Sequence, residues 1–214
     1  MSDSSIKKIR EPNSMILNGS GQVTAAPDLA ILRLGVVTTG ENLTLKQAEN
    51  ARLSQAILKA LERLGVTDIQ TYEYTINKNY EYENGNRLDK GYMIRNILEI
   101  RSNNMELVGE LIDTSLYYGA NTVDSLHFEV SDSSHYYLEA LNLAIMNAYE
   151  KAKSITEKLN ITLNPIPKQI NETSTSVSPS RAYNMKEGAA FTPIETGNLF
   201  IQASVITEFM YQDF

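Results

Sequence analysis

The sequence predicts an α+β protein, a long antiparallel β-sheet with about three helices packed on one face. Three observations lead to this prediction: apolar residues alternate along several runs, other segments carry apolar residues at helical spacing, and turn residues separate them. In chain order the elements read β-β-α-β-β-α-β-α-β-β, the pattern of helices segregated to one side of antiparallel strands. We expect residues 1–12 to form a disordered N-terminal tail and residues 13–214 to form a single domain.

The chain opens on two predicted strands joined by a short motif. Gly19 and Gly21 alternate in an apolar run, and Pro27-Asp28 then leads into a second apolar run. Proline presets φ for a turn and aspartate hydrogen-bonds nearby backbone, so we predict two antiparallel strands joined at this pair. The two glycines indicate a bulge or a close approach of another part of the backbone.

The remaining elements follow from periodicity and from residues typical of helix ends. The predicted strands span about residues 14–25, 29–39, 69–82, 91–101, 122–130 and 198–212, with an extended segment after residue 168. The predicted helices span about residues 44–64, 103–118 and 132–159. Thr44 with Gln47 forms a capping-box signature, and Gly65 and Gly119 stand where helix ends require a left-handed residue.

The third predicted helix carries small residues one turn apart, at Ala144, Ala148 and Ala152. Small side chains allow a helix to lie close to a sheet or to another helix. Between this helix and the closing strand, residues 171–195 form a long polar stretch that is typical of a mobile loop or a contact surface.

Residues 69–101 predict a hairpin rich in tyrosine. Asn-Gly at 84–85 tolerates positive φ and therefore marks the turn, and the return strand begins near Gly91-Tyr92. The tyrosines are Tyr72, Tyr74, Tyr80, Tyr82 and Tyr92. Two interpretations remain open. Tyrosine suits interfaces because it combines a large apolar area with a polar tip. Alternatively, the first two are core residues and the next two coat the hairpin by cross-strand pairing.

Composition and charge exclude several classes of protein. The net charge of −7 argues against nucleic acid as a main partner, because phosphate binding needs clustered Lys and Arg. The sequence contains no cysteine, which excludes disulfides, thiolate nucleophiles and cysteine-ligated zinc. No signal-peptide pattern and no apolar run of transmembrane length is visible, so we expect a soluble, cytoplasmic protein.

Each chemical motif has a simpler interpretation. Gly19-Ser20-Gly21 lacks the following helix and the Gly-Lys-Ser/Thr of a phosphate loop. His127 and His135 lie near carboxylates, which could indicate a metal site, but we expect them to be hydrogen-bonded surface histidines. No Gly-x-Ser-x-Gly elbow is present, which argues against acyl transfer. We expect no catalytic residues, no cofactor and no metal.

Several segments in order resemble the SIMPL domain family. The matching residues are Gly19-Ser20-Gly21 through Pro27-Asp28-Leu29-Ala30, Gly91-Tyr92, Gly119-Ala120, Leu126-His127-Phe128, Ala144, Ala148, Lys151-Ala152 and the strand from Gly197 to Tyr211. The family includes bacterial periplasmic immunogenic and oxidative-stress-related proteins and a mammalian protein that binds a kinase of the interleukin-receptor pathway. The resemblance implies an α+β fold, ring-shaped or channel-like oligomers, and a bacterial, stress-related setting. It implies no catalytic residues.

We therefore predict a non-enzymatic, self-assembling scaffold or binding protein. Its contacts are expected at the hairpin tip and the long loop, with Tyr80, Tyr82, Arg87, Tyr183 and Phe191 as candidate interface residues. One alternative is a small-molecule binder or weak enzyme with a pocket between the sheet and the helices. The other is an adaptor for a partner protein.

Overall fold

The structure, a computed structural model, describes residues 13–179 and 191–212. The strands are β1 (Asn13–Ala25), β2 (Leu29–Gly40), β3 (Ile69–Glu83), β4 (Asn86–Ser102), β5 (Thr122–Glu129), β6 (Thr162–Leu163), β7 (Gln169–Pro179) and β8 (Leu199–Gln212). The helices are α1 (Leu43–Arg63), the 3-10 helix η1 (Met105–Leu107), α2 (Val108–Tyr117) and α3 (Ser133–Leu159). The predicted α+β class is confirmed, and most element bounds fall within a few residues of those predicted. β4 begins five residues before its predicted start, and β7 occupies the first part of the stretch 171–195 that was predicted as a loop. The predicted tail and Tyr183 lie outside the described residues.

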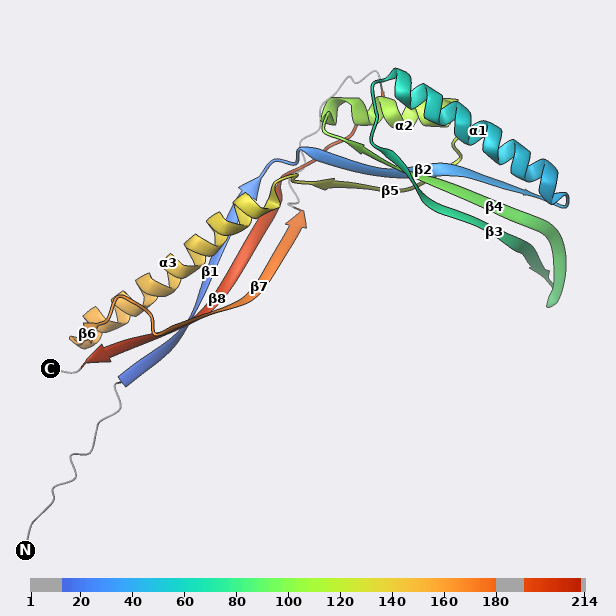
Figure 1. Cartoon of the computed structure of the whole chain (residues 1–214). Coiled ribbons are helices and arrows are strands. Elements are labelled where there is room, and N and C mark those ends of the chain that lie inside the picture. Colours follow the sequence, from blue (N-terminus) through green and yellow to red (C-terminus); the bar gives the residue numbers. More distant parts are fainter. Residues whose placement is uncertain (1–12, 180–190, 213–214) are drawn as a thin grey trace, which may run out of the picture. The chain divides into compact units, whose positions relative to one another are not determined.

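The strands divide into two antiparallel sheets, each within its own compact unit (Figure 1). Sheet A contains β1, β8, β6 and β7, and α3 belongs to the same unit. Sheet B has the order β3-β4-β2-β5 and shares its unit with α1, α2 and residues 191–197. The expectation that residues 13–214 form one domain stays a prediction.

The predicted pairing of the first two strands is wrong. β1 pairs with β8 in sheet A, whereas β2 pairs with β4 and β5 in sheet B. Asp28 does not close a turn on its own backbone. Its carboxylate accepts hydrogen bonds from the backbone N–H and the hydroxyl of Ser131, both at 2.6 Å, and Asn103 donates to its carbonyl at 3.0 Å. Pro27-Asp28 therefore immediately precedes β2 and is hydrogen-bonded to the segment that follows β5.

Sheet A is built around β8, which pairs with β1 on one side and with β6 and β7 on the other. The face of this sheet that carries the odd-numbered residues of β1 lies under α3 (Figure 1). The buried residues of this contact are Ala144, Ala148, Ala152, Val205 and Phe209. The alanines confirm the close packing expected from their one-turn spacing.

Gly19 and Gly21 explain how close the helix lies. A Cβ added at either glycine would stand 2.1 Å from a backbone carbonyl oxygen of α3, that of Ala144 or Ala140. Real Cβ atoms do not approach other atoms so closely, so only glycine fits at both positions. Of the two predicted explanations for this motif, the close backbone approach is the one that the structure shows.

In sheet B, α1 and α2 cover one face and leave the other without a helix (Figure 1). The covered face supplies the largest core of the described residues, formed from Leu32, Leu34, Val36, Ile57, Leu61, Leu98, Ile100, Val108 and Leu111 with smaller neighbours. Burying one large apolar side chain contributes about 1.5–3 kcal/mol to the stability of the fold. These contacts therefore hold α1 and α2 on sheet B.

Polar contacts set the position of α1 on the sheet. The predicted capping box is wrong by two residues, because Asn42 is the N-cap and its side chain accepts from the N–H of Leu45. Within the helix, Asn50 is buried, and its side-chain amide donates to the carbonyls of Val36 at 3.0 Å and Ile94 at 3.4 Å. These bonds link one helix residue to two neighbouring strands, which favours one helix position over sliding.

The glycine contact with α3 predicts a specific cost of substitution. Gly19→Ala should destabilise the protein by about 3 kcal/mol, since a methyl group must displace helix backbone rather than a flexible side chain. Ser20→Ala is the matched control and should change the free energy of unfolding by less than about 0.5 kcal/mol. Urea unfolding of both variants measures the difference. Equal stability of the two variants would contradict the packing of α3 described above.

Candidate interaction surface

The β3–β4 hairpin extends past the rest of sheet B as a two-stranded ribbon. β2 pairs with β4 only as far as Gly40 opposite Tyr92, and beyond this point β3 and β4 pair with each other alone. Gly91, with φ of +87°, lies where a Cβ would be 2.3 Å from the carbonyl oxygen of Gly40, so it permits the strand to pass the end of β2. Asn84 and Gly85, both at positive φ, close the tip as predicted.

Cations stacked on tyrosine rings hold the ribbon together. The guanidinium of Arg87 lies 4.3 Å from the centre of the Tyr80 ring, and Lys78 lies 4.4 Å from that of Tyr92. Lys78 also pairs with Asp89 at 2.9 Å. An isolated two-stranded ribbon is marginally stable in water, so these contacts support a segment with little core beneath it.

The aromatic residues of β3 are exposed rather than buried. Tyr72, Tyr74 and Tyr82 retain 51%, 48% and 71% of their accessible surface, and Ile76 and Tyr80 are also exposed. The interpretation of Tyr72 and Tyr74 as core residues is therefore wrong. β3 is the edge strand of sheet B, and α1 lies over β2 and β4 instead. A sheet edge that lies beyond its helices keeps both faces in solvent.

The face of sheet B without helices is covered by its own charged side chains. Glu99 is only 4% exposed and accepts hydrogen bonds from Arg33 at 2.7 and 2.8 Å and from Arg101 at 3.0 and 3.1 Å. Gln70 donates to the same carboxylate at 3.0 Å, and the Tyr72 ring lies 3.8 Å from the Arg33 guanidinium. The Arg33 guanidinium, followed by Arg101 and Gln70, holds the pKa of Glu99 below its ordinary value.

A second arginine crosses the same face. Arg95 on β4 pairs with Glu73 on β3 at 3.2 Å and with Asp124 on β5. The pKa of Arg95 is raised, first by its hydrogen bond to Asp124 and then by Glu73. Ile97 lies between Arg95 and Glu99 on the same face of β4, and it is fully buried although no helix covers it. The face of sheet B without helices is thus a fixed layer of ion pairs.

Residues 191–194 form a separate surface on α2. Thr192 donates its backbone N–H and its hydroxyl to Asp113, at 2.8 and 2.5 Å, and Ile194 packs against the core of the same unit. Phe191 is exposed beside Gly109. Gly109, beside Phe191, follows the C-terminal end of β4, whereas Tyr80 and Tyr82 lie next to the N-terminal end of that strand. A strand of 17 residues spans roughly 55 Å. The structure therefore does not join Phe191 to the hairpin tyrosines.

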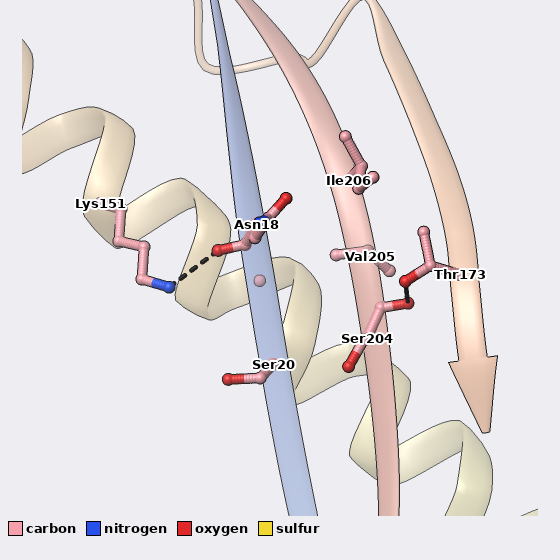
Figure 2. A pocket seen from close by; sticks show the side chains of 8 residues that line it. Asn18, Ser20, Lys151, Thr173, Ser204, Val205 and Ile206 are labelled. Carbon is pink, nitrogen blue, oxygen red and sulfur yellow. Dashed lines mark hydrogen bonds between the residues drawn. The ribbon is translucent and has the colours of Figure 1, made fainter. Parts of the chain in front are cut away.

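A shallow hollow of about 350 Å³ lies on sheet A (Figure 2). Its lining includes Asn18 and Ser20 of β1, Ser204 and Ile206 of β8, and Thr173 of β7. Gly19 and Val205 complete the lining on the strands, and Lys151 of α3 completes it from the helix, where it donates to the carbonyl of Asn18 at 2.7 Å. Seven of the eight lining residues therefore belong to strands of sheet A and one belongs to α3.

The structure gives no support to metal chemistry at the histidines. His127 is on β5 and His135 is in the first turn of α3, whose N-cap is Asp132. Among the described residues, no group of three or more His, Cys, Asp or Glu side chains could hold a metal ion. No helix in this part of the chain is long and apolar enough to cross a membrane.

A comparison with protein families shows to which family the chain belongs. The model of the SIMPL family, described as a protein of unknown function (DUF541), matches residues 15–209. The chain belongs to the SIMPL family. The match includes all of sheet B with α1 and α2, and sheet A with α3 apart from the first residues of β1 and the last residues of β8, so both sheets are features of this SIMPL protein.

The relatives of this SIMPL protein include named bacterial proteins. A 26 kDa periplasmic immunogenic protein of Brucella melitensis is 28% identical over 176 residues, which cover 79% of this chain and 70% of the relative. Uncharacterized protein YggE of Escherichia coli is 24% identical over 193 residues, covering 89% of this chain and 78% of the relative. A protein of the first name also occurs in Brucella abortus, again 28% identical.

These names correct the predicted location. The expectation of a cytoplasmic protein rested on the first residues of the sequence, which do not by themselves fix a compartment. Relatives that match over most of the chain are named as periplasmic and contradict it.

Sequence reasoning identified Tyr80, Tyr82 and Arg87 as neighbours at one tip, and the structure places them there. It missed the ion-pair layer around Glu99. Alternation of Arg95, Glu99 and Arg101 along one strand was visible, but their partners Arg33 and Asp124 come from two other strands. Only the strand order brings these charges together.

The Glu99 layer predicts a pH-dependent effect on stability. Because its pKa is lowered in the folded state, Glu99 stabilises the fold above its ordinary value of about 4.3, and this contribution is lost as the pH falls through the lower folded-state value. Glu99→Gln should therefore reduce the free energy of unfolding at pH 7, and the difference from wild type should shrink towards pH 2. Glu83→Gln at the hairpin tip is the control. A deficit that persists unchanged at pH 2 would contradict an ionic origin.

Proposed function

We propose that this SIMPL protein is a non-enzymatic scaffold or binding module that works in the periplasm and assembles with copies of itself. The proposal takes its location from relatives named as periplasmic. The stress-related role implied by the family resemblance stays a prediction, because nothing in the fold bears on it.

One observation carries the proposal: β3 and the ribbon present a row of exposed tyrosines, some fixed by stacked cations. Tyr80 is held by Arg87 and Tyr72 by Arg33, so these rings lose little conformational freedom when another surface covers them. Tyrosine and arginine are also the residues most enriched at the energetic centres of interfaces. A hairpin that only faced solvent would need neither exposed tyrosine rings nor cations that hold those rings in place.

The second candidate function is binding of a small polar molecule in the hollow on sheet A. Hydroxyls of Ser20, Ser204 and Thr173 face an open space of about 350 Å³, which is at the low end of ligand sites. Its lining combines the neutral polar side chains of Asn18, Ser20, Thr173 and Ser204 with Lys151 and with the apolar residues Val205 and Ile206. A partner-protein adaptor, the third candidate, would use the same tyrosines as self-assembly.

The proposal predicts an oligomer whose stability depends on the ribbon. Light scattering at tens of micromolar should give a mass above that of the 23.9 kDa chain. Tyr80→Ser combined with Tyr82→Ser should weaken association about tenfold or more, since losing an interface aromatic costs about 2 kcal/mol. Tyr117→Ser is the matched control, because Tyr117 is 84% exposed on α2.

A monomeric wild-type chain under these conditions would overturn self-assembly. An oligomer that tolerates the double substitution as well as it tolerates Tyr117→Ser would retain self-assembly and remove the hairpin tip from the interface.

A further inference from the structure

The outer edge strands of the two sheets differ in how far their backbone hydrogen-bonding groups are covered. On sheet A, the outer edge of β1 is blocked by its own helix. The N–H of Ser20 donates to the side-chain oxygen of Asn147 at 3.2 Å, and Lys151 donates to the carbonyl of Asn18 at 2.7 Å. Both helix side chains occupy backbone groups that would otherwise pair with another strand. This is a recognised way of preventing edge-to-edge association.

The outer edge of β3 in sheet B has no such protection. β3 pairs with β4 on one side, and no hydrogen bond from a side chain of residues 13–179 or 191–212 reaches its backbone. The strand has 15 residues, and its exposed side chains include large apolar or aromatic ones, Tyr72, Tyr74, Ile76, Tyr80 and Tyr82, together with polar and charged ones such as Asn77, Lys78 and Glu81. A long edge whose backbone groups are not blocked is a template for a further strand.

The structure also limits which residues of β3 can pair regularly. The register with β4 shifts between Thr71 and Glu73 and again between Lys78 and Tyr80. Between these irregularities the strand is regular, with Tyr74 and Ile76 on the face shared with Ile94 and with Glu73, Thr75 and Asn77 on the ion-pair face. A partner strand must match this alternation to keep apolar residues on one side.

We infer that β3 pairs antiparallel with β3 of a second copy of this chain, around a two-fold axis at Thr75. This inference rests on the proposed self-assembly and names its interface. Thr75 then lies opposite Thr75, Tyr74 opposite Ile76, and Glu73 opposite Asn77. Aromatic–β-branched and Thr–Thr pairs are among the favourable cross-strand pairs, and no like charges face each other.

We prefer the register centred on Thr75 to its neighbours. Centres at Tyr74 and Ile76 also oppose no like charges, but they lose the Thr–Thr pair. A centre at Asn77 places Glu73 opposite Glu81, two like charges. A centre between two residues places the ion-pair face of one copy beside the helix-covered face of the other. The chosen register joins two four-stranded sheets into one continuous sheet, with α1 and α2 of both copies on the same side.

Cross-linking tests the register directly, because the natural sequence has no cysteine. Opposed residues have Cβ atoms about 4.5–5.5 Å apart, close to disulfide range, so Thr75→Cys should give a covalent dimer under mild oxidation. Thr71→Cys is the matched control on the same strand. Its two copies would be separated by roughly 27 Å and should remain unlinked.

A charge at the axis tests the same contact without cross-linking. Thr75→Glu places two carboxylates opposite each other and should weaken dimerisation at least tenfold, while Arg95, its cross-strand neighbour, keeps the variant folded. Thr71→Glu should leave the solution mass unchanged. Thermal unfolding confirms that both variants fold.

The outcomes separate this inference from the proposed function. An oligomeric wild type whose Thr75→Cys variant does not cross-link, or whose Thr75→Glu variant keeps its mass, overturns β3 pairing and leaves self-assembly standing. Equal cross-linking of Thr71→Cys and Thr75→Cys also overturns it, because the register would be wrong. A monomeric wild type overturns both proposals.

Discussion

The contact between α3 and the backbone of β1 is the constraint on which sheet A depends. Gly19 and Gly21 leave room for helix carbonyls at a distance that no Cβ permits, and four alanines of α3 bring the helix down to that surface. With the helix so close, its side chains Asn147 and Lys151 reach the outer edge of β1. The same contact therefore supplies packing on one face and protection at one edge.

Each sheet has helices on one face only, and its other face is stabilised in a different way. On sheet A, the uncovered side carries hydroxyls and amides, such as Ser20 and Ser204, around the shallow hollow. On sheet B, arginines and carboxylates from four strands form a layer that buries Glu99 and Ile97 without a helix. Ion pairs of this kind are fixed in position, so we expect association through sheet B to use the β3 edge and the ribbon rather than this face.

Much of the secondary structure could be predicted because its signals are local. Asn84-Gly85 closes the hairpin, and Gly65 and Gly119 follow helix ends at positive φ. The errors have two different causes. Thr44 with Gln47 competes with Asn42 as a start for α1, and Asn42 begins the helix. Asp28 finds a partner in Ser131, which is distant in sequence, and so does not make the local turn that its residue type favours.

The sequence by itself determined the α+β class, the order of the elements, the family and the cluster of tyrosines, because periodicity, turn residues and spacing are properties of short segments. Only the tertiary structure decided that β1 and β2 belong to different sheets, that Glu99 meets two arginines, and that β3 is an unprotected edge. These features depend on which strands pair across long separations in sequence. Many strand orders can satisfy the same alternation, and the choice among them is made by the packing of the helices and by cross-strand contacts.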